Sequence, residues 1–212
     1  PEHIQAAIDR VGADALNFHL NPLQEAIQPE GDTDFRSLME HLPQTIEQLS
    51  VPCLVKEVGA GISRKTAEKL SRLPLAGVES AGVGGTSWAQ VESYRAPDQS
   101  VQATAGQQLA GFGVPTGESI RACRAAFGER VVIGSGGIRT GMDAAVALAL
   151  GADAVALAKP LLEAATISED AVVQKLESII YELRVIAFCT GSATVELLKK
   201  VPVCTPAHSG HW

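Results

Sequence analysis

Residues 131–139, Val-Val-Ile-Gly-Ser-Gly-Gly-Ile-Arg, join a short apolar run to a glycine-rich turn, and residues 140–150 follow with apolar side chains at helical spacing. This order is typical of a buried strand, a tight turn and a covering helix. The next apolar run, 154–158, ends on Ala-Leu-Ala-Lys (156–159). Two consecutive strands that close on such turns favour a (β/α)₈ barrel over a doubly wound sheet, because the phosphate-binding loops of many barrels follow the last two strands.

The alternation of strand and helix extends over most of the chain. Five buried strands are predicted, at Ala15 to Leu20, Pro52 to Val58, Gly77 to Ala81, Val131 to Gly134 and Ala154 to Ala158. Helices are predicted at Asp34 to Leu49, Ser63 to Leu73, Gly117 to Phe127 and Thr140 to Leu150, with terminal helices at Leu161 to Cys189 and Ala193 to Lys200. Thr140 and Asp143 form a capping box in this pattern, and Gly151 is a left-handed C-cap.

The expected architecture is α/β, the last five strands of a (β/α)₈ TIM barrel in a single domain of residues 1–212 that ends in a polar tail, 205–212. An eight-stranded barrel takes roughly 250 residues. The chain begins at Pro1 rather than at a methionine. We therefore expect a fragment that lacks about three upstream βα units, roughly the N-terminal third.

The composition limits the classes of partner. Of 212 residues, 46% are hydrophobic and 4% aromatic, and 17 basic against 24 acidic residues give a net charge of -7. Attraction of the whole protein to nucleic acid or to an anionic membrane is not expected, although a local basic pocket remains compatible with this charge. No apolar run is long enough for a membrane span, and four widely spaced cysteines are typical of reduced cytoplasmic thiols.

Two glycine-rich loops are candidate anion sites. Ser135-Gly-Gly-Ile-Arg139 lies between a strand and a helix, where backbone amides, a helix N-terminus and a guanidinium can face a phosphate. The alternative is a tight turn that needs glycine for a positive φ. Gly82-Val-Gly-Gly-Thr-Ser-Trp88 ends another strand and shares a rim with the first loop if the fold is a barrel, whereas the alternative is a flexible loop.

The segment His19-Leu-Asn-Pro-Leu-Gln-Glu25 gathers polar groups at the end of a strand. Alternation predicts His19 and Asn21 on one side of the strand, and Pro22 turns the chain so that Gln24 and Glu25 return over the strand ends. Glu25 is expected to share Mg²⁺ with substrate phosphates and water, as that ion is usually bound. A core histidine and a solvated loop carboxylate are the alternative.

Lys56 lies between apolar neighbours on a strand expected to be buried. An ammonium group in such a place needs an anionic partner. A flavin, a phosphate or a carboxylate in the barrel is the functional interpretation, and an ion pair with Glu57 or another acid is the structural one.

Together, His-Leu-Asn-Pro-Leu-Gln-Glu (19–25), Pro-Glu-Gly-Asp (29–32), Val-Lys-Glu-Val-Gly (55–59), Gly-Gly-Thr-Ser-Trp (84–88) and Ser-Gly-Gly-Ile-Arg (135–139) resemble the type 2 isopentenyl-diphosphate isomerases. The resemblance covers nearly the whole chain and is weakest after about residue 165. It implies a (β/α)₈ barrel that interconverts isopentenyl and dimethylallyl diphosphate, in isoprenoid biosynthesis, with FMN, Mg²⁺ and NADPH as reductant. It also implies a homo-oligomer.

The same resemblance implies roles for individual residues. Gln24 is the catalytic side chain beside the flavin, and Glu25 is the Mg²⁺ ligand. His19, Asn21 and Gln24 bind the substrate diphosphate and its reacting end. The implied cofactor-binding residues are Lys56 near the flavin ring and, around the ribityl phosphate, Thr86, Gly137, Ile138, Arg139, Ala158 and Lys159. One departure is Glu79-Ser-Ala81, where family members usually carry Asp first and Ser or Gly in place of alanine.

Two other functions fit parts of the pattern. An FMN-dependent 2-hydroxy-acid oxidoreductase has a phosphate loop like 135–143, but it uses a His and an Arg at a strand end where this chain has Gly-Val-Gly-Gly-Thr-Ser-Trp. A non-catalytic barrel remnant is the second alternative, because the upstream strands that contact the flavin ring have no match in the sequence.

Overall fold

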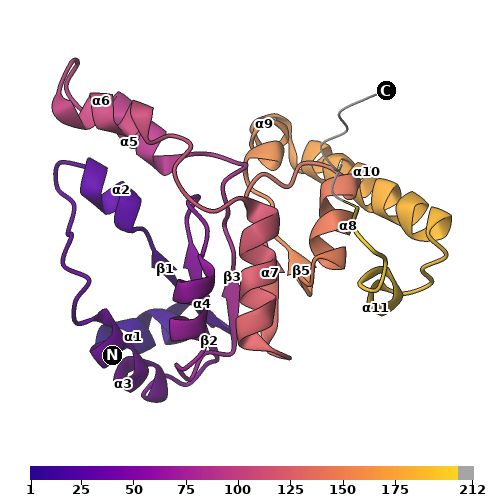
Figure 1. Cartoon of the computed structure of the whole chain (residues 1–212), viewed down its shortest axis with the longest axis horizontal. Coiled ribbons are helices and arrows are strands. Elements are labelled where there is room, and N and C mark those ends of the chain that lie inside the picture. The colour runs from indigo at the N-terminus through magenta and orange to yellow at the C-terminus, as the bar shows by residue number, and fades with distance from the viewer. Residues whose placement is uncertain (205–212) are drawn as a thin grey trace.

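Five parallel strands form one sheet in the order β1-β2-β3-β4-β5 in the computed structural model, which describes residues 1–204 (Figure 1). The strands are β1 (Leu16–Leu20), β2 (Cys53–Glu57), β3 (Gly77–Glu79), β4 (Val131–Gly134) and β5 (Ala154–Val155). The helices are α1 (Glu2–Val11), α2 (Pro22–Ile27), α3 (Leu38–Glu47), α4 (Arg64–Leu70), α5 (Trp88–Arg95), α6 (Val101–Gln108), α7 (Thr116–Phe127), α8 (Gly141–Ala149), α9 (Lys159–Ile167), α10 (Glu169–Cys189) and α11 (Val195–Leu198). All five predicted strands are confirmed, four of them with shorter bounds.

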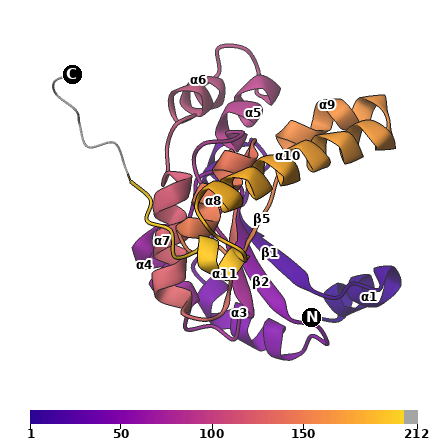
Figure 2. The same ribbon diagram turned by 90° about the vertical axis from the view of Figure 1, so that its right-hand side faces the viewer.

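Each strand pairs in parallel with the strand that follows it in the chain. A doubly wound sheet reverses its strand order at a switch point, whereas a barrel adds its strands consecutively. The barrel-type α/β architecture is therefore confirmed for the five described strands. Because all strands run the same way, their carboxyl ends lie together. Two views place α5, α6 and α9 at this end with α3 at the other (Figures 1 and 2), and Figure 1 places α2 there as well.

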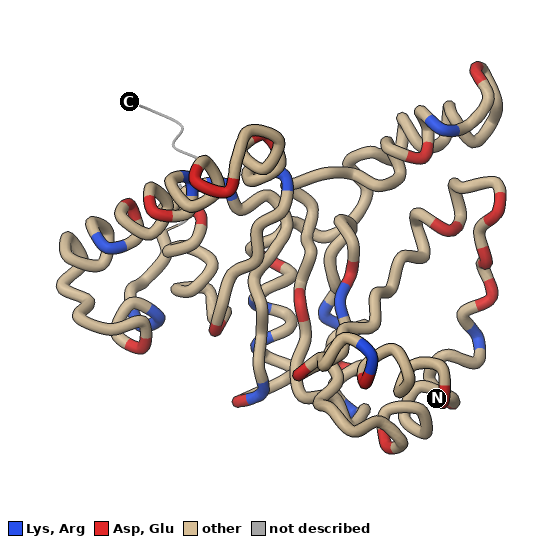
Figure 3. Tube along the Cα trace, turned by 180° about the vertical axis from the view of Figure 1, so that it is seen from behind, with Lys and Arg blue, Asp and Glu red and all other residues tan. Residues whose placement is uncertain are grey.

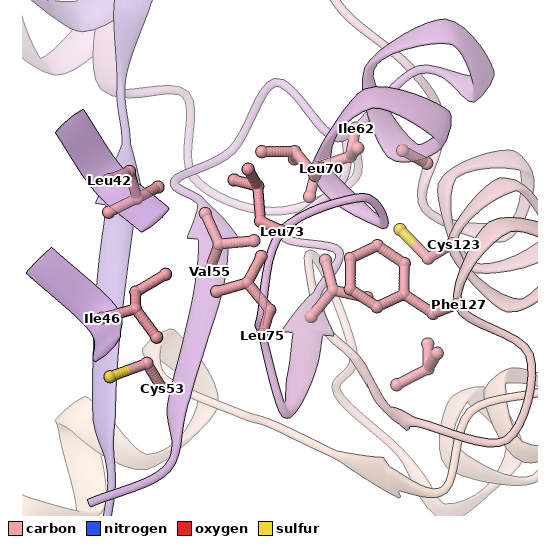
Figure 4. Close-up of a cluster of buried hydrophobic side chains, with 13 residues drawn as sticks. Leu42, Ile46, Cys53, Val55, Ile62, Leu70, Leu73, Leu75, Cys123 and Phe127 are labelled. Atoms are coloured by element: carbon pink, nitrogen blue, oxygen red, sulfur yellow. The ribbon is translucent and has the colours of Figure 1, made fainter. Parts of the chain in front are cut away.

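The hydrophobic core lies between one face of the sheet and helices α3, α4 and α7 (Figure 4). Val55, Val78 and Val132 come from the three central strands and are fully buried there. Side chains alternate between the two faces of a strand, so the neighbours of these valines point away from the core. Lys56 and Glu79 are register partners on that opposite face. Polar side chains of β2 and β3 therefore point to the interior of the barrel.

Three helices at the carboxyl end of the sheet, α2, α5 and α6, have no counterpart among the predicted elements. The α5 and α6 segments, WAQVESYR and VQATAGQQ, carry few apolar residues at helical spacing. Both begin at a serine N-cap, where the side chains of Ser87 and Ser100 accept hydrogen bonds from backbone amides. Capping and mutual packing, rather than an amphipathic stripe, support these helices.

The structure divides one predicted helix in two and confirms the predicted start of another. The helical stretch predicted over 161–189 is two helices, because Ser168 is extended and caps α10 through the amide of Ala171. The capping box of Thr140 and Asp143 at α8 is confirmed. The C-cap of α8 is Leu150 rather than Gly151, although Gly151 follows it with a φ of 113°.

Acidic residues follow one another along the segment between α2 and α3, which carries Glu30, Asp32 and Asp34 (Figure 3). Within residues 1–204, no helix is both long and apolar enough to cross a membrane. The predicted polar tail, residues 205–212, lies outside the described part of the chain.

Candidate active site

A cavity of about 390 Å³ opens at the carboxyl ends of β2, β3, β4 and β5. It is named the strand-end cavity below. Its walls are the loops that follow these four strands, together with Trp88 at the start of α5. All seven residues predicted to bind the cofactor line it, namely Lys56, Thr86, Gly137, Ile138, Arg139, Ala158 and Lys159. The structure therefore gathers residues that lie up to about a hundred positions apart into one site.

The two glycine-rich loops pack directly against each other at the rim of this cavity. A Cβ atom added to Gly137 would lie 2.3 Å from the carbonyl oxygen of Gly84, and Gly137 has a φ of 80°. The guanidinium group of Arg139 donates hydrogen bonds of 2.8 Å to the carbonyl oxygens of Gly84 and Gly137. The predicted shared rim is thus present. The glycines also serve the turn and the close approach of two backbones, so the tight-turn interpretation holds as well.

The cavity is basic within an acidic protein. Among residues 1–204, the charged side chains that line it are Lys56, Arg139 and Lys159 and the carboxylate of Glu79. The amides of Gly137 and Ile138 donate no hydrogen bond to any group within residues 1–204, and α9 begins at Lys159 without a side-chain cap. Unpaired amides, a helix N-terminus and cations on one wall are suited to a phosphate group.

A hydrogen-bonded group on the barrel side of the sheet forms the floor near the cavity. Asn17 Nδ2 donates to Glu79 Oε2 at 3.1 Å, and Ser135 Oγ donates to Glu79 Oε1 at 2.8 Å. The Ser135 hydroxyl also accepts from the amide of Ala81 at 3.0 Å, where the backbone has a φ of 38°. Asn17 was not among the predicted site residues, and Ser135 was predicted only as part of the glycine-rich loop 135–139. Period-2 alternation from His19 along β1 is the signal that identifies Asn17.

Lys56 does not make the ion pair with Glu57 that the structural interpretation expected. Its Nζ donates to the backbone carbonyl oxygen of Glu57 at 2.7 Å. The Glu57 carboxylate instead turns to the other face, where Oε2 accepts from the amides of Val58, Gly59 and Ala60 at 2.6, 2.8 and 2.6 Å. This leaves the charge of Lys56 directed along the cavity wall.

Gln24 lies on α2 next to the strand-end cavity. A narrow gap is lined by Gln24, Val58, Gly59 and Trp88, and the last three of these also line the cavity. Gln24 Nε2 donates to Glu92 Oε1 at 2.8 Å. Glu92 is 1% exposed and was not predicted as a site residue. Its place one helical turn after Trp88 is the signal that sequence inspection missed.

The other residues of the 19–25 motif are arranged differently from the prediction. His19 is exposed on β1, beside its register partner Lys56. Asn21 does not share its side of the strand, because the strand ends at Leu20 and Asn21 is the buried N-cap position of α2. Its Nδ2 donates to Glu25 Oε1 at 2.7 Å and lies 3.4 Å from Gln24 Oε1. Asn21 therefore holds the motif together from within.

Of the predicted pair, Gln24 lies next to the strand-end cavity, whereas Glu25 lies away from it. Glu25 lines a separate cavity of about 420 Å³ between α2 and α3, with Asp32 and Asp34. The amide of Asp32, followed by the Asn21 side chain, lowers the pKa of the Glu25 carboxyl through hydrogen bonds. An ionised carboxylate suits a divalent cation. Among residues 1–204, no group of three or more His, Cys, Asp or Glu residues is arranged to hold a metal without further ligands.

Comparison with known proteins places this geometry in a family. The profile of the FMN-dependent dehydrogenases matches residues 34–203. The chain belongs to this family. A solved mandelate oxidase with a monooxide FMN adduct has a TM-score of 0.64 to this family member at 20% identity, covering 93% of this chain and 57% of that one. A mandelate oxidase with (S)-2-phenylpropionate gives a TM-score of 0.66 at 23% identity, covering 93% and 57%. These similarities confirm the fold.

Curated relatives of this FMN-dependent dehydrogenase family member are named isopentenyl-diphosphate delta-isomerase, as the motifs predicted. The protein of Synechococcus sp. is 46% identical over 206 residues, which is 97% of this chain and 59% of the relative. That of Nostoc sp. is 47% identical over 192 residues, covering 91% and 55%. That of Methanothermobacter thermautotrophicus is 42% identical over 214 residues, covering 100% and 59%. The chain spans little more than half the length of these relatives.

Proposed function

We propose that this chain carries the cofactor phosphate site and the Gln24 loop of a type 2 isopentenyl-diphosphate isomerase. The observation that supports this most is the basic strand-end cavity lined by Lys56, Arg139 and Lys159, with Gln24 at its edge. Relatives at 42 to 47% identity bear the isomerase name. The reaction interconverts isopentenyl and dimethylallyl diphosphate by moving a proton across an allylic system.

The residues of the cavity fit FMN by their chemistry. The amides of Gly137 and Ile138 and the start of α9 would hold the phosphate, with Arg139 and Lys159 adding charge. Lys56, deeper on β2, would lie toward the flavin ring. When bound in reduced form, the flavin supplies a proton and an electron-rich face that ordinary side chains lack, since their pKa values are poorly matched to an unactivated alkene.

The 19–25 motif would handle the substrate. Gln24 has no titratable proton, so it would position or relay rather than act as a free base. Glu25 would bind Mg²⁺ together with the substrate diphosphate and water, because one carboxylate alone does not hold the ion. Glu25 already accepts three hydrogen bonds, one at Oε1 from Asn21 and two at Oε2 from Gln28 and the amide of Asp32. A carboxylate offers about four lone-pair positions, so about one remains for a metal. His19 and Asn21 would lie toward the diphosphate.

Further parts of the proposal concern the setting of the protein. NADPH would serve as the reductant of the flavin, and the protein would act as a homo-oligomer in the cytoplasm. All four cysteines are free, two of them buried, which agrees with a reducing compartment.

A 2-hydroxy-acid oxidoreductase is the second candidate, and the family name together with the mandelate oxidase fold favours it. Those enzymes need a histidine base and an arginine for the substrate carboxylate. Among residues 1–204, no histidine lines the strand-end cavity, and the loop Gly82-Val-Gly-Gly-Thr-Ser-Trp88 carries neither a histidine nor an arginine. The isomerase is therefore the better supported reaction.

The test begins with the visible spectrum of the purified protein. A flavin spectrum retained through desalting is expected, followed by conversion of isopentenyl diphosphate to its dimethylallyl isomer with FMN, a reductant and Mg²⁺. Turnover of a 2-hydroxy acid without isomerisation would favour the oxidoreductase. A protein that stays colourless with added FMN would favour the non-catalytic alternative.

Lys159 offers a sharper test of the phosphate site. Lys159→Ala removes a charged donor, so the affinity for FMN should fall by about tenfold, whereas riboflavin, which lacks the phosphate, should bind equally to both proteins. Lys175→Ala on α10 is the matched control, because Lys175 does not line the cavity. Equal losses for FMN and riboflavin would contradict the assignment of Lys159. Titration by fluorescence quenching gives both affinities.

A further inference from the structure

Arg95, the last residue of α5, is paired with two carboxylates from different parts of the chain. Its Nη1 donates to Glu92 Oε2 at 2.6 Å, and its Nη2 donates to Glu30 Oε1 at 2.9 Å. Hydrogen bonding to Glu30, followed by the charge of Glu92, raises the pKa of Arg95 above its usual value. The planar guanidinium group has two nitrogen edges and can hold both carboxylates at once, which a lysine cannot do in the same geometry.

The first carboxylate leads to Gln24. Glu92 is 1% exposed and accepts from Gln24 Nε2 at 2.8 Å. Because Glu92 Oε1 accepts from the nitrogen end of the Gln24 amide, the oxygen end is directed toward Asn21 Nδ2. A buried carboxylate needs a paired cation. Arg95 is the cation in hydrogen-bond contact with Glu92 within residues 1–204.

The second carboxylate leads to Glu25. Glu30 lies two residues before Asp32, and the amide of Asp32 donates to Glu25 Oε2 at 2.8 Å. The Arg95–Glu30 ion pair therefore fastens the segment between α2 and α3 to the end of α5, at the point where that segment turns to meet Glu25. Arg95 lines neither the strand-end cavity nor the cavity between α2 and α3.

We propose that Arg95 is a positioning residue that sets the orientation of the Gln24 amide and the place of the Glu25 carboxylate together. This inference rests on the proposed function, because it assigns to Arg95 a role in the reaction that Gln24 and Glu25 serve. Arg95 acts on Gln24 through Glu92, and it acts on Glu25 through the segment between α2 and α3, which carries Glu30 and Asp32.

The activity test compares Arg95→Gln and Arg95→Lys with a matched control, Arg64→Gln. Arg64 is an exposed arginine of α4, paired with Glu68 at 3.0 Å, and lines neither the strand-end cavity nor the cavity of Glu25. Arg95→Gln should lower kcat by about 10- to 100-fold and raise the Mg²⁺ concentration for half-maximal rate by about threefold or more, with FMN affinity unchanged. Arg95→Lys should recover part of kcat. Arg64→Gln should change none of these.

Glu30→Gln tests the effect of Arg95 on Glu25 separately from its effect on Gln24. It removes the carboxylate that fastens the segment between α2 and α3, and it leaves the Arg95–Glu92 pair in place. The shift in Mg²⁺ requirement should therefore reappear in Glu30→Gln, with a smaller loss of kcat than in Arg95→Gln.

A measurement without turnover keeps this inference separate from the proposed function. The side-chain amide of Gln24 gives an NMR resonance that Gln24→Ala identifies by its loss. Arg95→Gln should shift this resonance and speed its exchange with water, whereas Arg64→Gln should not. Wild-type protein without isomerase activity would overturn the proposed function, and the resonance would still decide the role of Arg95.

Two results would overturn the inference itself. One is wild-type kcat in Arg95→Gln together with an unmoved Gln24 resonance. The other is an equal loss of kcat, FMN affinity and unfolding temperature in Arg95→Gln with no recovery in Arg95→Lys, which would mean that the residue only supports the fold.

Discussion

Gln24 is held at both ends of its amide by neighbours from different elements. Glu92 of α5 accepts from its nitrogen, and Asn21 at the start of α2 approaches its oxygen. An amide fixed in this way presents one defined face to the gap beside Trp88. The motif 19–25 was informative because it contains both Gln24 and Asn21, yet the other partner of Gln24, Glu92, lies on a helix that the sequence pattern did not predict.

The first prediction concerns this residue. Gln24→Ala should lower turnover by about 10²- to 10⁴-fold, the usual effect of removing a positioned proton-transfer group, and leave FMN affinity unchanged. Gln24 does not line the cavity that would hold the phosphate. The exposed Gln107→Ala on α6 is the matched control for loss of a glutamine. Steady-state assays and flavin titration give the two quantities, and similar losses in both would contradict the assigned role.

At the scale of elements, α8 supports the loop that forms one wall of the cavity. Thr140 and Asp143 close a capping box, and Asp143 Oδ2 also accepts from the amide of Arg139 at 2.9 Å. The helix start thus fixes the last residue of the glycine-rich turn. The capping box was predictable because it depends on residues three positions apart in the chain.

Thr140→Ala is the second prediction. Loss of an N-cap should lower the free energy of unfolding by about 1 kcal/mol, equivalent to about 2–4 °C in the unfolding temperature. Because the same loop lines the cavity, FMN affinity should fall as well. Ser63→Ala, which removes the N-cap of α4, a helix that does not line the cavity, should cost similar stability with no change in FMN affinity. Equal affinity in both variants would show that α8 does not shape the site.

Other elements lay beyond sequence-based prediction for physical reasons. α5 and α6 carry few apolar residues, so they lack the helical spacing of apolar side chains that predicts a helix. They are supported by serine caps and by packing on each other. Glu25 was expected beside Gln24, but consecutive residues of a helix point about 100° apart, and α2 directs them to different cavities. The strands were predictable because buried apolar runs are continuous in parallel sheets.

At the scale of the whole molecule, charge is distributed unevenly. The chain has a net charge of -7, yet three cations line the strand-end cavity. The composition excluded general attraction to polyanions. It could not predict the position of this basic cavity, because the parallel order of the strands is what brings Lys56, Arg139 and Lys159 together. The gathered site is therefore a consequence of topology, which also fixes where the core lies.

The core gives the last prediction through Cys123, which lies on α7 with no exposed surface. Burial raises the pKa of its thiol from 9.0 to about 12. The pKa in the folded protein is thus above that of the unfolded chain, so the stabilisation is complete below pH 9 and is lost as the pH rises toward 12. The free energy of unfolding of the wild type, minus that of Cys123→Ala, should be constant up to about pH 8 and smaller by about 1 kcal/mol at pH 10. The subtraction removes the titration of other groups and the constant cost of the cavity in the variant.

Urea unfolding at several pH values gives the difference, and thiol labelling should modify Cys189 and Cys204 in the folded protein but Cys123 only after unfolding. A difference that stays constant through pH 10 would mean that the interior at Cys123 admits water, and that the core between the sheet and α7 opens without global unfolding.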